Sequence, residues 1–299
     1  MESLDDLRNK LESAVDIHSV VSTMKAVAAS NIGQYEQAVI ALEDYYLTIS
    51  LGLAVYFKSK KIALDNTKEI SKKKDGNNTG IIVFGSDQGL VGHFNDSLKD
   101  FVIKSLEQIK GKKEIWTVGE RIETILKDSD LKITQVFNVP NSVNAITLLI
   151  TNILIKAQES IDNAELDDFF IIHNKNDQGI NYIPVIQKLL PLDVEWSFKF
   201  SQLKWPTRKI PEIAGDKEAT LKSLIREYLF VSLFKACAES LQSENTNRLA
   251  AMKRAEKNID ELLKDLNQDY HRLRQSSIDE ELFDIVAGFE ALKNLKGSK

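Results

Sequence analysis

The residues that could do chemistry begin with a glycine-rich turn that follows an apolar run. The run is Gly80–Gly85, and the turn after it reads Ser86-Asp87-Gln88-Gly89-Leu90-Val91-Gly92. A turn between a buried strand and a helix can bind phosphate through its backbone N–H groups. These glycines, at positions 85, 89 and 92, match neither the GxGxxG pattern nor a P-loop. We therefore expect them to shape the turn rather than to hold a nucleotide.

The sequence offers no suitable set of residues for binding a metal ion or for nucleophilic catalysis. The four histidines lie on different predicted elements without metal-ligand spacing: His18, His93, His173 and His271. The only cysteine, Cys237, lies in a predicted helix without a nearby base. Only His93 adjoins the glycine-rich turn, and a structural role suits it better. The sequence predicts no catalytic site, cofactor or metal ion, so we expect the chain not to be an enzyme.

Bulk composition narrows the class of protein. The chain has 299 residues, 43% of them hydrophobic, which is enough for a core, and its net charge of −5 argues against a nucleic-acid partner. A single cysteine fits a reducing compartment. The first residues are acidic, unlike a signal peptide, and the apolar window Ala145–Ala157 is too short to span a bilayer. We expect a soluble, cytoplasmic chain without a transmembrane segment.

A long helical arm is predicted at the N-terminus, over residues 1 to about 60. Alternating steps of three and four give a row in which fourteen of sixteen positions are apolar or tyrosine, typical of a coiled coil. The row is Leu4, Leu7, Leu11, Ala14, His18, Val21, Lys25, Ala28, Ile32, Tyr35, Val39, Leu42, Tyr46, Ile49, Leu53 and Tyr56. Lys25 could reach water past Ala28, or it could meet an outside partner.

A second helical arm is predicted from Glu218 to Leu295, which contains no proline and one glycine, Gly288. An unbroken helix of this length would extend roughly 115 Å and needs a long partner. Its apolar row is Met252, Ala255, Ile259, Leu262, Leu266, Tyr270 and Leu273, followed after a phase shift by Ile278, Leu282, Ile285, Phe289 and Leu292. The simplest arrangement is an antiparallel coiled coil of the two arms.

Between the arms, predicted strands alternate with helices. After Gly80–Gly85, strands are expected at 114–118, 132–137 and 169–173 and near 180–187, with helices between the earlier ones. This alternation indicates a parallel, Rossmann-like α/β domain inserted between the arms. The predicted domains are therefore residues 1–75, 76–210 and 211–299.

Three segments together resemble the gamma subunit of F-type ATP synthases, and in detail the alternate bacterial form, whose membrane ring is often sodium-coupled. The first segment is Met24-Lys25-Ala26-Val27-Ala28-Ala29-Ser30, and the second runs from Ser86 to Asn95. The third runs from Ser243 to Lys253 and continues from Tyr270 to Leu282. The order and spacing of the three agree with the family over essentially the whole chain.

The resemblance implies a non-catalytic rotor shaft in the central stalk, which turns inside a ring of alpha and beta subunits that hold the nucleotide sites. It also implies an epsilon subunit and a membrane c-ring as partners, at the cytoplasmic face of the bacterial inner membrane. The resemblance assigns partner contacts to Met24, Lys25, Arg248, Arg274, Gln275 and Glu281, and a structural role in the loop to Ser86, Asp87, Gly89, Leu90 and Gly92.

Other interpretations remain open for these residues. Arg248 ends a polar run, Glu239–Arg248, that a solvated helix face would also explain, and Arg274 and Glu281 could be ordinary exposed charges. The alternative to a rotor is a non-enzymatic coiled-coil scaffold with an α/β docking domain. A third possibility is a nucleotide-dependent enzyme that uses the Gly85–Gly92 turn. The coupling ion is a property of membrane subunits, so this chain does not determine it.

Overall fold

The computed structural model describes residues 3–60, 78–109, 111–163, 166–177, 181–192, 194–209 and 211–296. These residues form two compact units: a sheet unit, within residues 28–248, and a helical-pair unit, made of residues up to 27 and from 249 onward. Helices α1 (Leu4–Lys60) and α6 (Lys217–Lys296) contribute to both units. The three-part division at residues 75 and 210 stays a prediction.

The sheet unit is built on five strands in the order β3-β2-β1-β4-β5. They are β1 (Thr79–Phe84), β2 (Lys113–Val118), β3 (Ile133–Phe137), β4 (Asp168–Asp177) and β5 (Asn181–Leu190). The first four pair in parallel, as predicted, but β5 pairs with β4 in antiparallel register, so the sheet is mixed. The all-parallel prediction was wrong here, because the three residues between the two strands are too few for a crossover.

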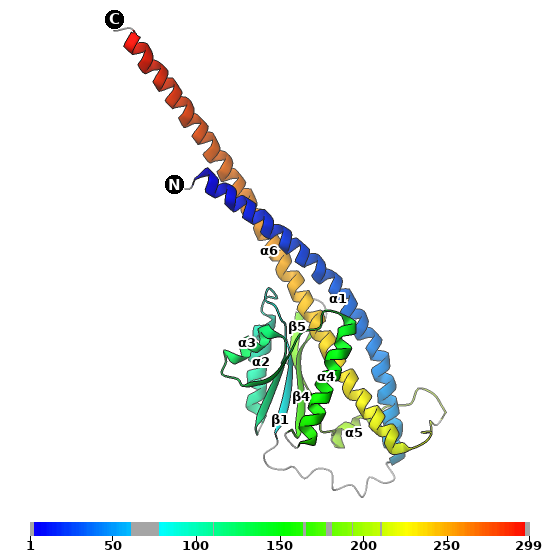
Figure 1. Cartoon of the computed structure of the whole chain (residues 1–299). Coiled ribbons are helices and arrows are strands. Elements are labelled where there is room, and N and C mark those ends of the chain that lie inside the picture. The colour runs from blue at the N-terminus through cyan, green and yellow to red at the C-terminus, as the bar shows by residue number, and fades with distance from the viewer. Residues whose placement is uncertain are drawn as a thin grey trace. The chain divides into compact units, whose positions relative to one another are not determined.

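Helices cover both faces of this sheet (Figure 1). Ile81 and Val83 of β1 share a core with residues of α2 (Phe94–Gln108) and α3 (Glu120–Lys127). Ile82 and Phe84 point to the other face, where α1, α4 (Val143–Asp162), α5 (Val194–Ser201) and α6 pack. Because both faces are covered, β1 is an uninterrupted apolar run rather than an alternating one.

The apolar row predicted along α1 is confirmed. All sixteen positions are buried or half-buried, and Ala28 and Leu53 are completely inaccessible. Within the helical-pair unit, Lys25 pairs with Glu256 and His18 lies 3.2 Å from Asp260. Moving forward along α1 therefore means moving backward along α6, so the two helices of this unit run antiparallel as predicted.

The row predicted along α6 needs a correction. Leu262 is 50% exposed, and the neighbouring Leu263 is half-buried in its place. Beyond Leu273 the predicted row continues through Ile278, Leu282 and Ile285, but all three are exposed. The side chains of Phe289 and Leu292 lie outside the described ones. The last part of α6 thus carries an apolar row that no other described residue covers.

One described helix, α1, passes a composition test for a membrane span over Leu4–Lys58, with a mean hydropathy of 1.5 in its most apolar window. Length and composition alone carry little weight, since core helices pass the same test. In the sheet unit, Ile49 and Leu53 of α1 belong to the hydrophobic core, and Tyr56 is buried as well. The apolar character of α1 is therefore used for packing within this chain.

Candidate functional site

The turn after β1 is fixed by hydrogen bonds within the chain. The Ser86 N–H donates to Asn95 Oδ1 at 3.3 Å, and Asn95 Nδ2 donates to Ser86 Oγ at 2.8 Å. The backbone oxygen of Ser86 accepts from the Arg121 N–H at 3.0 Å. Ser86 is fully buried. The serine thus joins the end of β1 to the starts of both α2 and α3.

Asp87 lies just beyond the carboxyl end of β1, where parallel sheets often bind anions such as phosphate. Its Oδ1 accepts from the Glu120 N–H at 3.1 Å, at the first residue of α3, and its Oδ2 accepts from the Val139 N–H at 3.1 Å. Helix N-termini attract negative charge because their first N–H groups have no partner within the helix. Here Asp87 takes the first of those donors, and the Ser86 carbonyl takes the next two, from Arg121 and Ile122, so groups of the chain itself occupy the start of α3.

The backbone of the same turn explains part of its composition. A Cβ on Gly85 would lie 2.4 Å from the Ile122 side chain, so only glycine lets α3 approach β1 this closely. Gly92 has φ +61°, which favours glycine, whereas Gly89 has open space around its Cα. Leu90 also has a positive φ, of 60°, and its side chain is 65% exposed. A rigid turn therefore presents one apolar side chain to solvent.

The polar run of α6 packs against the end of the sheet instead of facing water. Ser240 Oγ donates to the Phe84 carbonyl at 3.0 Å, and Ser243 Oγ donates to the Asn174 carbonyl at 3.3 Å. Glu239, Ser240, Ser243, Glu244 and Asn245 are all buried. The interpretation of this run as a solvated helix face was wrong, because Ser240 and Ser243 donate hydrogen bonds to carbonyl groups of the strands.

Glu239 is the centre of a charged cluster within that packing. Its Oε2 lies 2.9 Å from His173 Nε2, and its Oε1 lies 3.6 Å from Lys175 Nζ and 4.0 Å from Lys235 Nζ. Burial raises the pKa of the Glu239 carboxyl, but the hydrogen bond from His173 and the charges around it outweigh burial and hold the pKa below its usual value. The carboxylate is thus ionised and clamps α6 to β4.

Arg248 pairs with Glu244 one turn earlier on α6, at 2.6 Å, and only 14% of its side chain is exposed. Burial raises the pKa of Glu244, the arginine acts against that rise, and the charge of Asp87 adds to it. Asn31 of α1 donates to Asn245 at 3.4 Å beside this pair. Arg248 is therefore mainly engaged within the sheet unit, and its contact with a partner stays a prediction.

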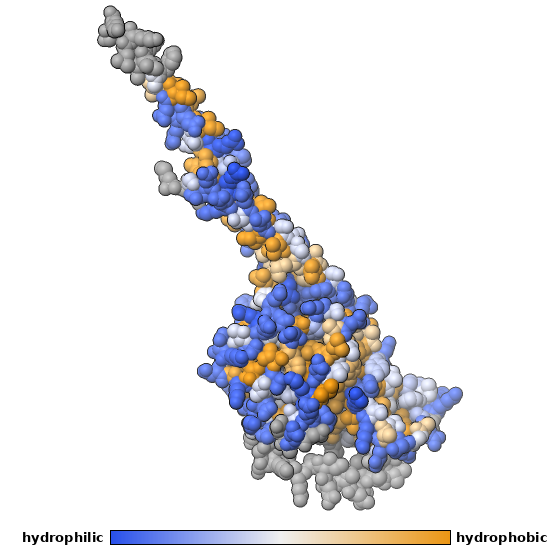
Figure 2. Space-filling view, in the orientation of Figure 1, coloured by the Kyte–Doolittle hydropathy of each residue, from blue (hydrophilic) through white to orange (hydrophobic). Residues whose placement is uncertain are grey.

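The other predicted contact residues lie in the helical-pair unit. Met24 and Lys25 are half-buried on α1, and Lys25 Nζ bonds both carboxylate oxygens of Glu256, at 2.5 and 2.6 Å. Arg274, Gln275 and Glu281 are exposed on α6. Around them lies an apolar set that is 48–71% exposed: Ile278, Leu282, Phe283, Ile285 and Val286. Figure 2 shows hydrophobic residues among hydrophilic ones on this unit.

Sequence reasoning missed several of these contacts. The partners of Asp87 lie 33 and 52 residues further along the chain, and His173 lies 66 residues before Glu239. The available signal was the presence of small hydroxyl residues three apart, Ser240 and Ser243, which suits close helix packing. His93 is exposed, with its ring 3.8 Å from Asp96, and no group of three potential metal ligands occurs among the described residues.

Comparisons with known proteins extend this picture. The model of the ATP synthase family matches residues 3–292. The chain is 26% identical to the ATP synthase gamma chain of Nautilia profundicola, over 98% of this chain and 100% of that one. It is 24% identical to the gamma chain of Bdellovibrio bacteriovorus with the same coverage.

Solved structures share the fold. The chain is similar to a chain of the mitochondrial ATP synthase of Euglena gracilis, with a TM-score of 0.62 and 18% identity over 97% of this chain and 94% of that one. It is also similar to a chain in the central stalk and c-ring structure of the Tetrahymena thermophila enzyme, with a TM-score of 0.56 and 20% identity, over 79% and 99% of the two chains.

Proposed function

The chain belongs to the ATP synthase gamma-chain family, and we propose that it acts as the non-catalytic rotor shaft in the central stalk of an F-type ATP synthase. In this role it couples rotation of a membrane ring to nucleotide chemistry on alpha and beta subunits. The observation that carries the proposal is the end of α6, where Ile278, Leu282 and Phe283 stand exposed. A lone helix with a row of exposed apolar side chains needs a partner surface.

The mechanism follows from asymmetry. A ring of similar subunits around one helical shaft meets a different face of the shaft at each subunit. A shaft can shift a subunit between two conformations only if it binds them with different affinities. The apolar row of α6 and its polar side supply such a difference. Rotation then presents each face to each subunit in turn.

The predicted contacts are of two kinds, polar and apolar. Arg274, Gln275 and Glu281 are exposed and supply hydrogen bonds or charge to the ring, whereas the apolar row supplies a low-friction surface. Lys25 is paired with Glu256, so its contact requires the ring to compete with that pair. Arg248 and Met24 are half-buried, so we place them as secondary contacts.

The remaining assignments rest on the family. The similar structures are a central stalk with c-ring from the Tetrahymena enzyme, and a rotor and an F1 part with c-ring from the Euglena enzyme. By analogy we propose alpha, beta and epsilon subunits and a c-ring as partners of this chain, at the cytoplasmic face of a bacterial inner membrane. The coupling ion belongs to the membrane subunits.

The test uses alpha and beta subunits from the same organism. Size-exclusion chromatography should give one copy of the chain per ring, and ATP hydrolysis should rise when the chain is added. A chain truncated after Arg272 should still fold, because most of the described residues that the truncation removes are exposed, but it should stimulate hydrolysis less. If the full chain neither joins the ring nor changes hydrolysis, and dimerises instead, a coiled-coil scaffold replaces the rotor.

A further inference from the structure

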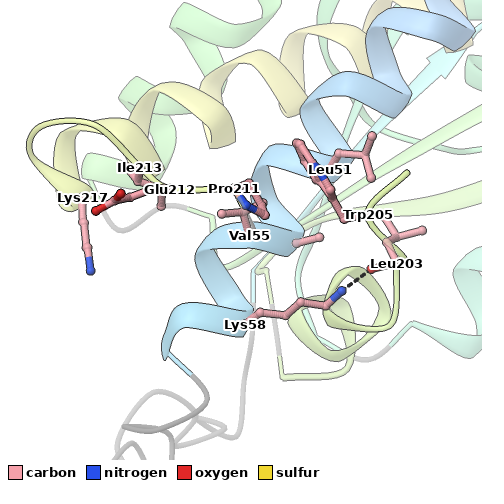
Figure 3. A pocket seen from close by; sticks show the side chains of 10 residues that line it. Leu51, Val55, Lys58, Leu203, Trp205, Pro211, Glu212, Ile213 and Lys217 are labelled. Carbon is pink, nitrogen blue, oxygen red and sulfur yellow. Dashed lines mark hydrogen bonds between the residues drawn. The ribbon is translucent and has the colours of Figure 1, made fainter. Parts of the chain in front are cut away.

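A cavity of about 350 Å³ lies within the sheet unit, away from the turn after β1 and the polar run of α6. It lies between the end of α1, the loop after α5 and the segment that leads into α6 (Figure 3). Its lining consists of Leu51, Ala54, Val55, Lys58, Leu203, Trp205, Pro211, Glu212, Ile213 and Lys217. This volume is within the range of small-ligand pockets.

The body of the cavity is apolar. In Figure 3, Leu51 and Val55 on α1 gather with Trp205 from the facing loop. Seven of the ten lining residues have apolar side chains. Trp205 is 37% exposed, although burying an indole would be favourable, and its Nε1 donates to Thr207 Oγ1 at 3.0 Å. Such a lining suits a hydrocarbon chain.

A cation lies beside this apolar body. Lys58 reaches from α1 and donates a hydrogen bond to the Leu203 carbonyl (Figure 3). An ammonium group carries three N–H donors, so two remain for an incoming anion. Because the Lys58 side chain is exposed at the cavity, its charge is open to a ligand head group.

The surroundings add positive charge. Lys217 lines the cavity, and three further cations lie in the neighbouring segments: Lys204, Arg208 and Lys209. All four are exposed, and none has an ion pair among the described residues. Three acids lie in the same segments: Glu212, which also lines the cavity, Asp216 and Glu218. One of them, Asp216, already accepts from the Glu218 N–H at 3.0 Å at the start of α6. The balance around the cavity therefore favours an anionic ligand.

We propose that this cavity binds an anionic amphiphile, with its hydrocarbon chain against Leu51, Val55 and Trp205 and its acid head group on Lys58. A free fatty acid and an acyl chain of an anionic lipid share this chemistry. The proposal does not depend on the rotor function, because it concerns only residues of the sheet unit.

The experiment titrates the purified full chain with dodecanoate below its micelle concentration, and follows Trp205 fluorescence. We expect saturable binding with one molecule per chain, and quenching when a terminally brominated fatty acid is used. Dodecanol and dodecyltrimethylammonium, which share the chain but not the negative head, should bind more weakly. Trp205→Phe should remove the signal, since Trp116 and Trp196 do not line the cavity.

Variants test the two parts of the site separately. Lys58→Met keeps the length of the side chain and should weaken dodecanoate binding about tenfold while leaving dodecanol unchanged, because only a charged hydrogen bond is lost. Val55→Phe fills the cavity and should weaken both ligands. Lys222→Met, on α6 outside this lining, is the matched control and should change neither. Circular dichroism of each variant checks that it folds.

Vesicles distinguish the two sources of the ligand. Binding to zwitterionic vesicles only when they contain anionic lipid, and its loss in Lys58→Met, would assign a membrane lipid. Binding of dodecanoate without vesicle binding would assign a free acid. The proposal is wrong if binding does not saturate, if the three head groups bind equally, or if Lys58→Met and Val55→Phe both bind dodecanoate like the unaltered chain.

Discussion

Two stretches of the single helix α6 reverse the usual relation between polarity and burial. Residues 239–248 are rich in serine, glutamate and asparagine, yet most of them are buried. Residues 278–286 include Leu282, Phe283 and Ile285, yet these are 58–71% exposed. Polarity along this helix therefore does not follow exposure to water.

The difference has a physical cause in each stretch. The carbonyl groups of Phe84, at the end of β1, and of Asn174, within β4, need hydrogen-bond donors, and Ser240 and Ser243 supply them. None of the described residues covers the later stretch, so burial of its apolar side chains is available to stabilise a complex with a partner. The first stretch stabilises the fold, and the second is expected to stabilise an assembly.

The largest expected effect is in the buried stretch. Glu239→Ala removes the carboxylate that pairs with the buried His173 and with two lysines, and we expect a loss of about 3 kcal/mol in the free energy of unfolding. Glu261→Ala removes an exposed pair on the same helix and should cost under about 0.5 kcal/mol. Urea unfolding of the full chain measures both values, and equal effects would remove the contrast between the two regions.

The exposed stretch should respond in the opposite way. Leu282→Ser should leave the unfolding free energy of the isolated chain within about 0.5 kcal/mol, because the side chain is 58% exposed. Its affinity for the alpha and beta ring should fall about tenfold, since burial of a leucine is lost. Glu280→Ser is the neighbouring control. A large loss of stability without any loss of affinity would contradict this division.

Acid should separate two neighbouring glutamates of the buried stretch. The folded pKa of Glu239 lies below its unfolded value of 4.5, so its stabilisation is present above about pH 4.5 and is lost as the pH falls through the folded pKa. The folded pKa of Glu244 lies above 4.5, so stability rises as the pH falls through that pKa towards 4.5.

Two substitutions test these opposite signs. Glu239→Gln should reduce the loss of stability in acid, and Glu244→Gln should remove the gain that precedes it. Unfolding free energies measured between neutral pH and about pH 3 would show both changes. The same sign in both variants would mean that the two carboxyl groups do not differ as their surroundings require.

The smallest effect is expected at Lys25. Its pair with Glu256 is partly exposed, so Lys25→Met should lower the melting temperature of the chain only slightly. The difference should shrink when salt is raised to about 1 M, because salt screens exposed charges. Lys253→Met, an exposed lysine on α6, is the control. A difference that persists in high salt would indicate packing by the lysine stem instead of charge.

Features that depend on local sequence could be predicted, whereas features that depend on contacts between distant residues could not. The α1 row was predictable because a repeat of three and four is local, and each of its sixteen positions is at least half-buried. The first four strands were predictable for the same reason. The strand near residues 180–187 was predicted, but its antiparallel direction was missed, because the alternation of strands and helices was extended one strand too far.

The candidate site was less accessible to sequence reasoning. A polar run on a helix looks solvated unless one knows that strand ends lie against it, and the partners of Asp87 lie 33 and 52 residues away. Leu262 and Leu263 are adjacent leucines, so the repeat alone did not decide which of them is the more buried. The exposed end of α6 looked like a coiled-coil seam because its spacing continues, although nothing described covers it.

The most direct test of the rotor is observation of rotation. A probe is attached through Glu107→Cys, an exposed position on α2, in a chain whose only native cysteine, Cys237, is buried. The alpha and beta ring is immobilised and ATP is added. We expect stepwise rotation of the probe in one direction, which stops when ATP is exhausted. Hydrolysis that continues while the probe stays still would contradict the central claim that this chain turns within the ring.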